Sequence, residues 1–239
     1  MKLCSRVSLA VFLTVFSACG LEENDDARLL IFSTTYDFNE SEHGWIHGFA
    51  DYPAGPDDST LYELKYAYTD QPADTKLTKK SVMLSGKNLS EDLFMYLKKQ
   101  ITGLKPNTEY TITFSIELAS DLHADLVVGS GPANGVYLKA GATHLEPKSV
   151  IESGYYIMNI DKGNQSTQGE DMMSLGEIVT PQNSTGYTII IKNNTMANSR
   201  YVAKSNTNGE LWLIIGTDSG FEGTTTLYYS KVNVLFSAS

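Results

Sequence analysis

Period-two alternation of apolar and polar residues is the feature that most constrains the fold of this chain. In the segment EYTITFSIEL (109–118) the apolar side chains fall on one side: Tyr110, Ile112, Phe114, Ile116 and Leu118. The segments 61–68 and 225–236 alternate in the same way, and short apolar runs at 186–193 and 211–217 are bounded by turn residues. Such alternation, rich in Thr, Tyr, Ile and Val, is typical of half-buried strands. The pattern predicts an all-β protein.

One segment gives mixed signals. In LSEDLFMYLKKQI (89–101), Ser90 could cap a helix, acidic residues follow it, and lysines come later, as in a helix. The segment also leads directly into a turn and a strand, so we expect it to be extended. Since no Pro-, Gly- or Ser-rich linker divides the rest of the chain, residues 28–239 are expected to form one domain.

The N-terminus has the pattern of an export signal. Lys2 and Arg6 precede an apolar run at 7–16, which is shorter than the roughly 20 residues that span a bilayer. The residues Phe-Ser-Ala before Cys19 resemble the lipobox of bacterial lipoproteins. The resemblance implies that residues 1–18 are removed and that Cys19 becomes the acylated first residue. The alternative is an ordinary signal peptide followed by an incidental cysteine.

Removal of residues 1–18 and acylation of Cys19 would determine the charge and the cysteine content of the exported chain. Cys4 would be removed and Cys19 acylated, which leaves no thiol for a disulfide or a metal site. Loss of Lys2 and Arg6 changes the formal charge from −10 to −12, a charge that disfavours nucleic acid as a partner. Residues 19–27 are expected to form an acidic tether. We therefore expect attachment to the bacterial outer membrane through acyl chains on Cys19, either surface-exposed or periplasmic.

Three segments resemble parts of one fold family: YDFNESEHGW (36–45), ITGLKPNTEYTITFSIEL (101–118) and TTLYYSKVNVLF (225–236). They are similar to the opening strand, the central hairpin and the closing strand of carbohydrate-binding-module and galactose-binding-like jelly rolls. GLKPNTEY also resembles fibronectin type III domains, whose tyrosine packs back on the turn, but that fold needs only about 100 residues. The resemblance implies a single jelly-roll-type antiparallel β-sandwich.

Such jelly rolls often hold a structural calcium ion between the first and last strands. Asp37 and Glu40 offer carboxylates near the first strand, but Ser230 and Lys231 stand where the closing strand should supply an acid. Calcium takes six to eight oxygen ligands, which two carboxylates do not provide. A calcium site at Asp37 and Glu40 therefore remains an open expectation.

The sequence carries no catalytic motif. His43 and His47 are four residues apart, but HGWIHG reads as a loop entering a strand, where that spacing has no meaning. The motifs HExxH and GxSxG and a phosphate-binding glycine loop are absent from the sequence. A carboxylate pair could serve a glycosidase or a lyase, but no catalytic residue is assigned.

Two polar-rich connections, 129–147 and 159–171, are the candidate ligand-binding regions. They flank strands expected near 136–140 and 153–160, and their side chains converge if these strands are neighbours. Trp45 is the better candidate for an exposed aromatic, with a core-capping role as the open alternative, and Trp212, in LWLII, is expected to be a core residue. The candidate ligand-binding residues are Trp45, Tyr137, Lys139, Glu146, Asp161, Asn164, Gln165 and Asp171.

These features favour a lipid-anchored, non-catalytic binding module for a neutral glycan. Sugars are recognised by aromatic faces combined with amide and carboxylate partners, and the chain contains 14 tyrosines and two tryptophans. Two alternatives stay open: a carboxylate-dependent enzyme that degrades polysaccharide, and a structural or assembly lipoprotein without a small ligand.

Overall fold

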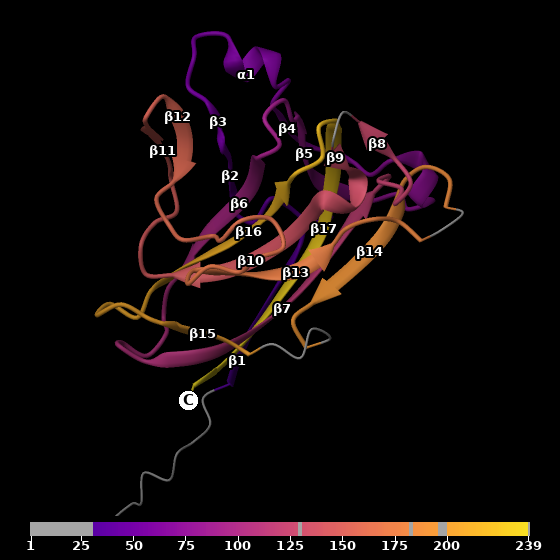
Figure 1. Cartoon of the computed structure of the whole chain (residues 1–239). Helices are drawn as coiled ribbons and strands as arrows, with labels where there is room; N and C mark the ends of the chain where they lie inside the picture. Colours follow the sequence, from indigo (N-terminus) through magenta and orange to yellow (C-terminus); the bar gives the residue numbers. More distant parts are fainter. Residues whose placement is uncertain (1–30, 129–130, 182–183, 196–199, 239) are drawn as a thin grey trace, which may run out of the picture.

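The computed structural model describes residues 31–128, 131–181, 184–195 and 200–238, which are almost entirely β (Figure 1). The predicted signal peptide, Cys19 and the tether lie outside these ranges. Within them, no helix is both long and apolar enough to cross a membrane. The first strands and helices are β1 (Ile31–Asp37), β2 (Ile46–Ala50), β3 (Tyr52–Pro53), α1 (Asp58–Leu61), β4 (Lys65–Asp70), η1 (Ala73–Thr75), β5 (Lys80–Lys87), β6 (Leu93–Ile101) and β7 (Glu109–Ser120). The remainder are β8 (Val127–Val128), β9 (Gly131–Pro132), η2 (Ala133–Gly135), β10 (Val136–Thr143), β11 (Ser149–Glu152), β12 (Tyr155–Met158), β13 (Met172–Glu177), β14 (Thr188–Asn193), β15 (Tyr201–Lys204), β16 (Leu211–Ser219) and β17 (Thr224–Ala238).

The strand order is that of a jelly roll. One sheet has the order β14-β7-β17-β5-β4, with β1 paired to β17 and β15 to β7, and the other has the order β13-β10-β16-β6-β2. Along the chain, β5, β7, β14 and β17 enter the first sheet, while β6, β10, β13 and β16 enter the second. Two Greek keys shared between facing sheets define the jelly roll. The prediction of an all-β, jelly-roll-type antiparallel β-sandwich is confirmed.

The core lies between these two sheets, where the sequence pattern placed it. All five predicted apolar residues of β7 are at most 2% exposed, and the strand alternates between buried and partly exposed positions over most of its length. Val232, Val234 and Phe236 of β17 are buried in the same cluster. The period-two pattern therefore identified the inward face of both strands correctly.

Two local expectations have different outcomes. The segment 89–101 is extended from Leu93 onward, as β6, so that prediction is confirmed. The strand expected at 61–68 begins only at Lys65, because α1 ends at Leu61 and Glu63 adopts a positive φ of 48°. The Asp58 carboxylate accepts a hydrogen bond from the Gly55 N–H and so favours a turn there over a strand.

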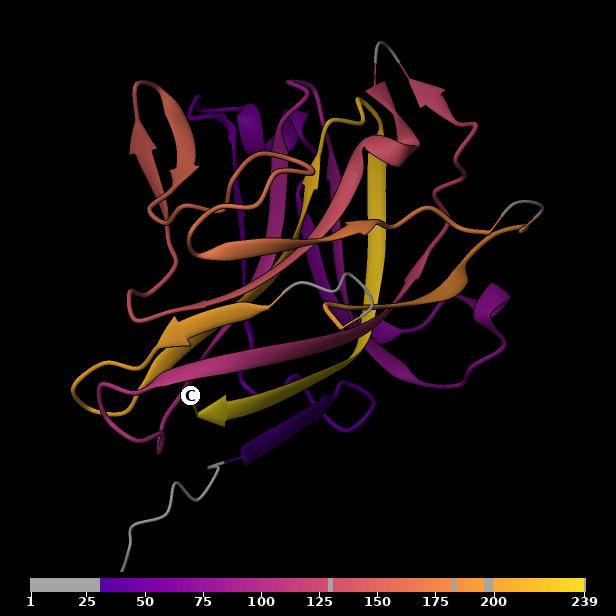
Figure 2. The same ribbon diagram turned by 60° about the horizontal axis from the view of Figure 1, so that its bottom comes forward.

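The chain between β10 and β13 leaves the sandwich and returns across it. It forms the hairpin β11–β12, which stands out at the upper left of Figure 1 and pairs with β3, and then the segment 159–171. Figure 2 shows this segment curled beside β13 and β10. The strands expected near 136–140 and 153–160 are thus not neighbours: β10 lies in the five-stranded sheet and β12 in the three-stranded one. The condition under which the candidate residues would converge is therefore not met.

Candidate ligand-binding surface

The five-stranded sheet turns one face to the core and the other outward. Residues 93, 95 and 97 of β6 join the main core, so Phe94, Tyr96 and Lys98 point outward. Phe94 and Tyr96 are nevertheless buried, because Met158 and Ile160 pack over them in a second apolar cluster. The chain between β10 and β13 therefore covers part of the outward face.

The other end of this face stays accessible and carries a tryptophan. Trp212 of β16 pairs with Gln100 of β6 on one side and with Thr143 of β10 on the other, and paired residues share a face. Gln100 is exposed and Trp212 is partly exposed. The Lys98 ammonium lies 5.4 Å from the centroid of the Trp212 ring, a cation–π contact that restricts the indole. We call this strip, with Glu146 and Lys148, the Trp212 surface.

Glu146 joins this surface through two lysines. Its Oε1 lies 2.8 Å from Lys98 Nζ, and its Oε2 lies 2.8 Å from Lys148 Nζ. Hydrogen bonds from Lys148 and Lys98 lower the pKa of Glu146, so the carboxylate stays ionised and accepts hydrogen bonds at neutral pH. Lys98 also donates to the Pro147 carbonyl at 2.7 Å and so holds the chain after β10 beside Trp212.

Thr143, which pairs with Trp212, also lines a cavity of about 200 Å³. The lining of this cavity includes His144, Glu170, Asp171 and Lys204. On the Trp212 surface itself, an aromatic ring lies beside an amide, a carboxylate and two ammonium groups. That combination can stack on the C–H face of a sugar and pair with its hydroxyls.

The two tryptophans lie differently from the preferred sequence interpretation, in which Trp45 is the exposed candidate and Trp212 the core residue. Trp45 is 5% exposed and packs edge-on against Tyr36 and Phe38, at centroid distances of 5.4 Å and 6.3 Å. Of the two roles left open for Trp45, the structure shows burial in the core, and the expectation that Trp212 belongs to the core is wrong. Alternation in β16 carried the missing signal, because Leu211, Leu213 and Ile215 point inward and leave Trp212 on the outward face.

Four of the predicted residues lie in segment 159–171: Asp161, Asn164, Gln165 and Asp171. The two carboxylates among them bind the loop backbone. The Asp161 carboxylate accepts the N–H groups of Gly163 at 3.0 Å and Glu170 at 2.9 Å, and Asp171 Oδ2 accepts the Asp161 N–H at 2.9 Å. The Asn164 carbonyl accepts the Thr167 N–H at 2.8 Å. Gly163 has a φ of +68°, and a Cβ there would meet the Thr167 carbonyl. This segment is closed by its own polar groups.

The other candidate residues lie apart from one another. The connection 129–147 is largely strand, since β10 occupies Val136–Thr143. Lys139 is fully buried, while Tyr137 is partly exposed at the far end of β10, where it pairs with Asp218 and Glu177. Of the eight candidates, Glu146 lies on the Trp212 surface and Asp171 lines the cavity at Thr143.

Replacing Asp161 with alanine is expected to loosen the segment 159–171. Two backbone N–H groups lose their acceptor, which costs on the order of 1–2 kcal/mol and lowers the melting temperature by a few degrees. The backbone hydrogen bonds also lower the pKa of Asp161, so this stabilisation is present above the ordinary carboxyl pKa and is lost as the pH falls through the lowered value. Thermal unfolding at neutral pH tests this, with Asp161→Asn as the control that keeps one acceptor oxygen. A variant as stable as the wild type would contradict it.

The expected calcium position contains an ion pair. Asp37 Oδ2 lies 3.0 Å from Lys231 Nζ, and Asp37 Oδ1 accepts the Asn39 N–H at 3.0 Å. Hydrogen bonds from Asn39 and Lys231 lower the pKa of Asp37. An ammonium group thus stands beside the carboxylate that a cation would need, and the donor set does not fit calcium.

A buried charge cluster, missed in the sequence, anchors segment 159–171 to the sheet. Asp218 Oδ2 lies 2.7 Å from Lys162 Nζ and 3.4 Å from Lys139 Nζ, and Lys162 Nζ also lies 2.8 Å from Asp51 Oδ2. Lys139 donates to the carbonyls of Lys162 and Thr167. The side chains of Asp218 and Asp51 are 0% and 9% exposed. A polysaccharide therefore has no access to this carboxylate pair.

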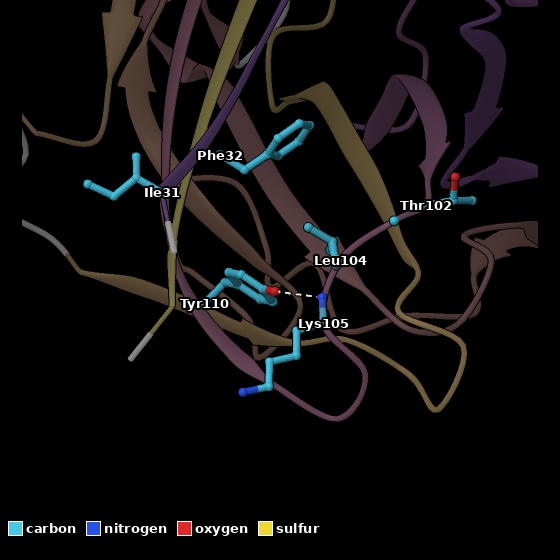
Figure 3. Close-up of a pocket in the computed structure, with 7 residues that line it drawn as sticks. Ile31, Phe32, Thr102, Leu104, Lys105 and Tyr110 are labelled. Atoms are coloured by element: carbon cyan, nitrogen blue, oxygen red, sulfur yellow. Dashed lines mark hydrogen bonds between the residues drawn. The ribbon is translucent and has the colours of Figure 1, made fainter. Parts of the chain in front are cut away.

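A second cavity, of about 140 Å³, lies where β1 begins (Figure 3). Its walls include Ile31, Phe32 and Leu104, and the Tyr110 hydroxyl accepts the Lys105 N–H at 2.9 Å. Tyr110 thus contacts the turn that precedes β7. The described residues that line this cavity include neither an amide nor a carboxylate side chain, whereas the Trp212 surface has both.

Known proteins give only distant matches to this chain. No protein-family model matches it, and no curated protein matches it. Similar solved structures include the enzymatically active domain of bacteriophage CBA120 tailspike protein 4, at 8% identity and a TM-score of 0.38, which covers 82% of this chain and 20% of that one. They also include TmCBM61 in complex with β-1,4-galactotriose, at 8% identity and a TM-score of 0.38, covering 82% and 92% of the two chains. The CBM27-1 module of Caldicellulosiruptor saccharolyticus in complex with mannohexaose matches at 11% identity and a TM-score of 0.35, covering 84% and 96%. Several neighbours are thus carbohydrate-binding modules, but at these TM-scores they carry no argument about the site.

Proposed function

We propose that this protein is a lipid-anchored, non-catalytic binding module that recognises a neutral glycan at the Trp212 surface. The observation that carries the proposal is the partly exposed Trp212 ring on the outward sheet face, flanked by Gln100 and Glu146. An apolar ring stacks on the C–H face of a sugar, and the amide and carboxylate accept or donate at its hydroxyls.

Side chains that are already held in place favour the Trp212 surface over the loops as the binding site. Lys98 is 7% exposed and contacts the Trp212 ring, Glu146 and the Pro147 carbonyl together. The ring and the carboxylate are therefore held in place before a ligand arrives, which reduces the ordering cost of binding. The Asp161 carboxylate, by contrast, accepts two backbone N–H groups of its own loop, and segment 159–171 contains no aromatic residue.

Replacing Trp212 with alanine is expected to weaken glycan binding about thirtyfold. A central aromatic anchor contributes about 2 kcal/mol or more to a binding surface. An array of neutral oligosaccharides identifies the strongest binder, and titration calorimetry with that oligosaccharide measures the loss. Trp212→Phe should keep part of the affinity, and Tyr155→Ala removes a more exposed aromatic on the β11–β12 hairpin as a control. Wild-type protein that binds no neutral oligosaccharide, or Trp212→Ala protein that binds as the wild type does, would contradict the proposal.

The membrane anchor is the second part of the proposal. The lipobox-like residues before Cys19 support it, and two or more acyl chains hold a protein at a membrane where one chain is marginal. The chain between Cys19 and β1 is rich in Glu and Asp and leads to Ile31. We infer an outer-membrane location, with the glycan either at the cell surface or in the periplasm.

Replacing Cys19 with alanine is expected to abolish lipid attachment. The wild type should incorporate a palmitate analogue in cells, and the variant should accumulate as an unlabelled precursor that retains residues 1–18. Electrophoresis after metabolic labelling measures both. A wild-type protein that takes up no label contradicts the anchor and leaves the glycan proposal standing.

A further inference from the structure

Three carboxylate oxygens of the charge cluster have no hydrogen-bond partner within the described part of the chain, and one of them, Asp51 Oδ2, forms an ion pair with Lys162. The other two are Oδ1 of Asp218, whose side chain is fully buried, and Oδ1 of Asp92, which precedes β6. One carboxylate oxygen from each of Asp51, Asp92 and Asp218 lies within 4.8 Å of the others. A buried acceptor without a donor is costly, so this arrangement calls for a missing proton or cation.

The charge balance favours a proton over a metal ion. Three ionised carboxylates face two ammonium groups, those of Lys139 and Lys162, so the fully ionised cluster carries one net negative charge. One proton neutralises it, whereas a divalent cation would leave one buried positive charge. The Lys162 ammonium already lies among the carboxylates, 2.7 Å from Asp218 and 2.8 Å from Asp51. A proton on Asp92 would donate to the partnerless Asp218 Oδ1 and give both oxygens a partner.

We propose that the Asp92–Asp218 pair is a proton-operated clamp on segment 159–171: one shared proton holds that segment against the turn before β6, and loss of the proton loosens it. The proposal does not depend on the glycan or on the lipid anchor. It links the position of Glu170 and Asp171, which line the cavity at Thr143, to pH.

The contacts of Gln165 show how the clamp acts. Its backbone N–H donates to Asp218 Oδ2 at 2.9 Å, and its side-chain amide donates to the Glu91 carbonyl at 3.2 Å. Gln165 thus joins β16 to the turn that carries Asp92. When both carboxylates are ionised, their repulsion separates the two surfaces that Gln165 bridges.

The electrostatics of Asp92 support a switch in the mildly acidic range. Burial raises its pKa, Lys162 opposes this, and the carboxylates of Asp51 and Asp218 raise it further, to about 6. The charged groups that face Asp92 come from four segments of the fold: Asp51 after β2, Lys162 in segment 159–171, Asp218 in β16 and, beyond it, Lys139 in β10. Since the folded pKa lies above the ordinary carboxyl value, the stabilisation is complete at low pH and is lost as the pH rises through about 6. Acidification from pH 7.5 to pH 5 should therefore tighten the clamp.

Asp92→Asn tests the clamp, because asparagine mimics the protonated acid at every pH. At pH 7.5 the variant should melt a few degrees above the wild type, and amide hydrogen exchange in residues 161–171 should slow about tenfold or more, since one pKa unit corresponds to a factor of ten. The difference in melting temperature should be smaller at pH 5 and should close only below the ordinary carboxyl pKa. Asp125→Asn, at an exposed aspartate, is the matched control and should follow the wild type at both values. The comparison uses the full chain.

Two results would overturn the proposal. One is an Asp92→Asn protein whose melting and exchange in residues 161–171 equal those of the wild type at pH 7.5. The other comes from the wild type alone: carbon-13 carboxyl resonances of labelled aspartate should include one that titrates near pH 6, and a spectrum in which all of them titrate below pH 5 refutes the shared proton. The second measurement applies even where the variant does not fold.

Discussion

Replacing Trp45 with alanine is expected to lower the free energy of unfolding by about 3–5 kcal/mol, as for other large aromatic residues in a core. Trp45 is 5% exposed and lies edge-on to Tyr36 and Phe38. The truncation removes these contacts and leaves a cavity at the start of β2, between the two sheets. Denaturant unfolding followed by circular dichroism measures the change.

Two variants make this result specific to packing. The Trp45 indole Nε1 has no hydrogen-bond partner among the described residues, so Trp45→Phe should cost far less than alanine does. Trp212→Ala is the matched control, because the same side chain is removed from a partly exposed site. It should change stability by about 1 kcal/mol or less. Equal losses for Trp45→Ala and Trp212→Ala would contradict the assignment of one tryptophan to the core and the other to the surface.

The two tryptophans also show why the sequence misplaced the binding surface. Trp212 stands in a run, LWLII, that reads as continuously apolar. The run has that composition because Ile214, on the outward face, is buried under Met158 and Ile160. Alternation is visible only where the outward face meets water, so a covered sheet face hides it. For Trp45, the glycine and histidine neighbours in the sequence indicate a loop. A position in a loop does not prevent burial of the side chain against Tyr36.

The fold was easier to predict than the site. Strands β7 and β17 have one face in the core and one facing outward, and their alternation identified the buried residues. The segments that resemble jelly rolls include parts of β1, β7 and β17, which pair with one another in one sheet. A strand with one face in the core and one face outward leaves a local pattern of alternation in the sequence.

The charge cluster leaves no such local pattern. Asp51, Asp92, Lys139, Lys162 and Asp218 come from five separate segments, and each reads alone as an ordinary polar residue. Lys139 looked like a candidate ligand contact because it stands among polar neighbours, yet it is fully buried. Only the long-range register, which pairs β10 with β16, brings its ammonium to Asp218.

Replacing Asp218 with alanine is expected to destabilise the protein by about 3–5 kcal/mol, because it leaves the buried Lys139 ammonium without its carboxylate partner. Lys162 would keep the ion pair with Asp51 and the nearby Asp92, whereas the Lys139 ammonium would keep only backbone carbonyls. Burial lowers the pKa of Lys139, and Asp218 is the largest opposing influence on it. Loss of Asp218 should therefore make Lys139 easier to deprotonate.

An exposed ion pair provides the matched control. Asp70 and Lys80 lie 2.9 Å apart with side chains 79% and 45% exposed, so Asp70→Ala should cost about 1 kcal/mol or less. In a double-mutant cycle, Asp218→Ala combined with Lys162→Met should lose less stability than the two single losses together, because the methionine no longer needs a counter-charge. Additive losses would mean that Asp218 stabilises the fold through Gln165 and the loop backbone and not through its charge. A loss equal to that of Asp70→Ala would show that water reaches the cluster and that segment 159–171 is not held by buried ions.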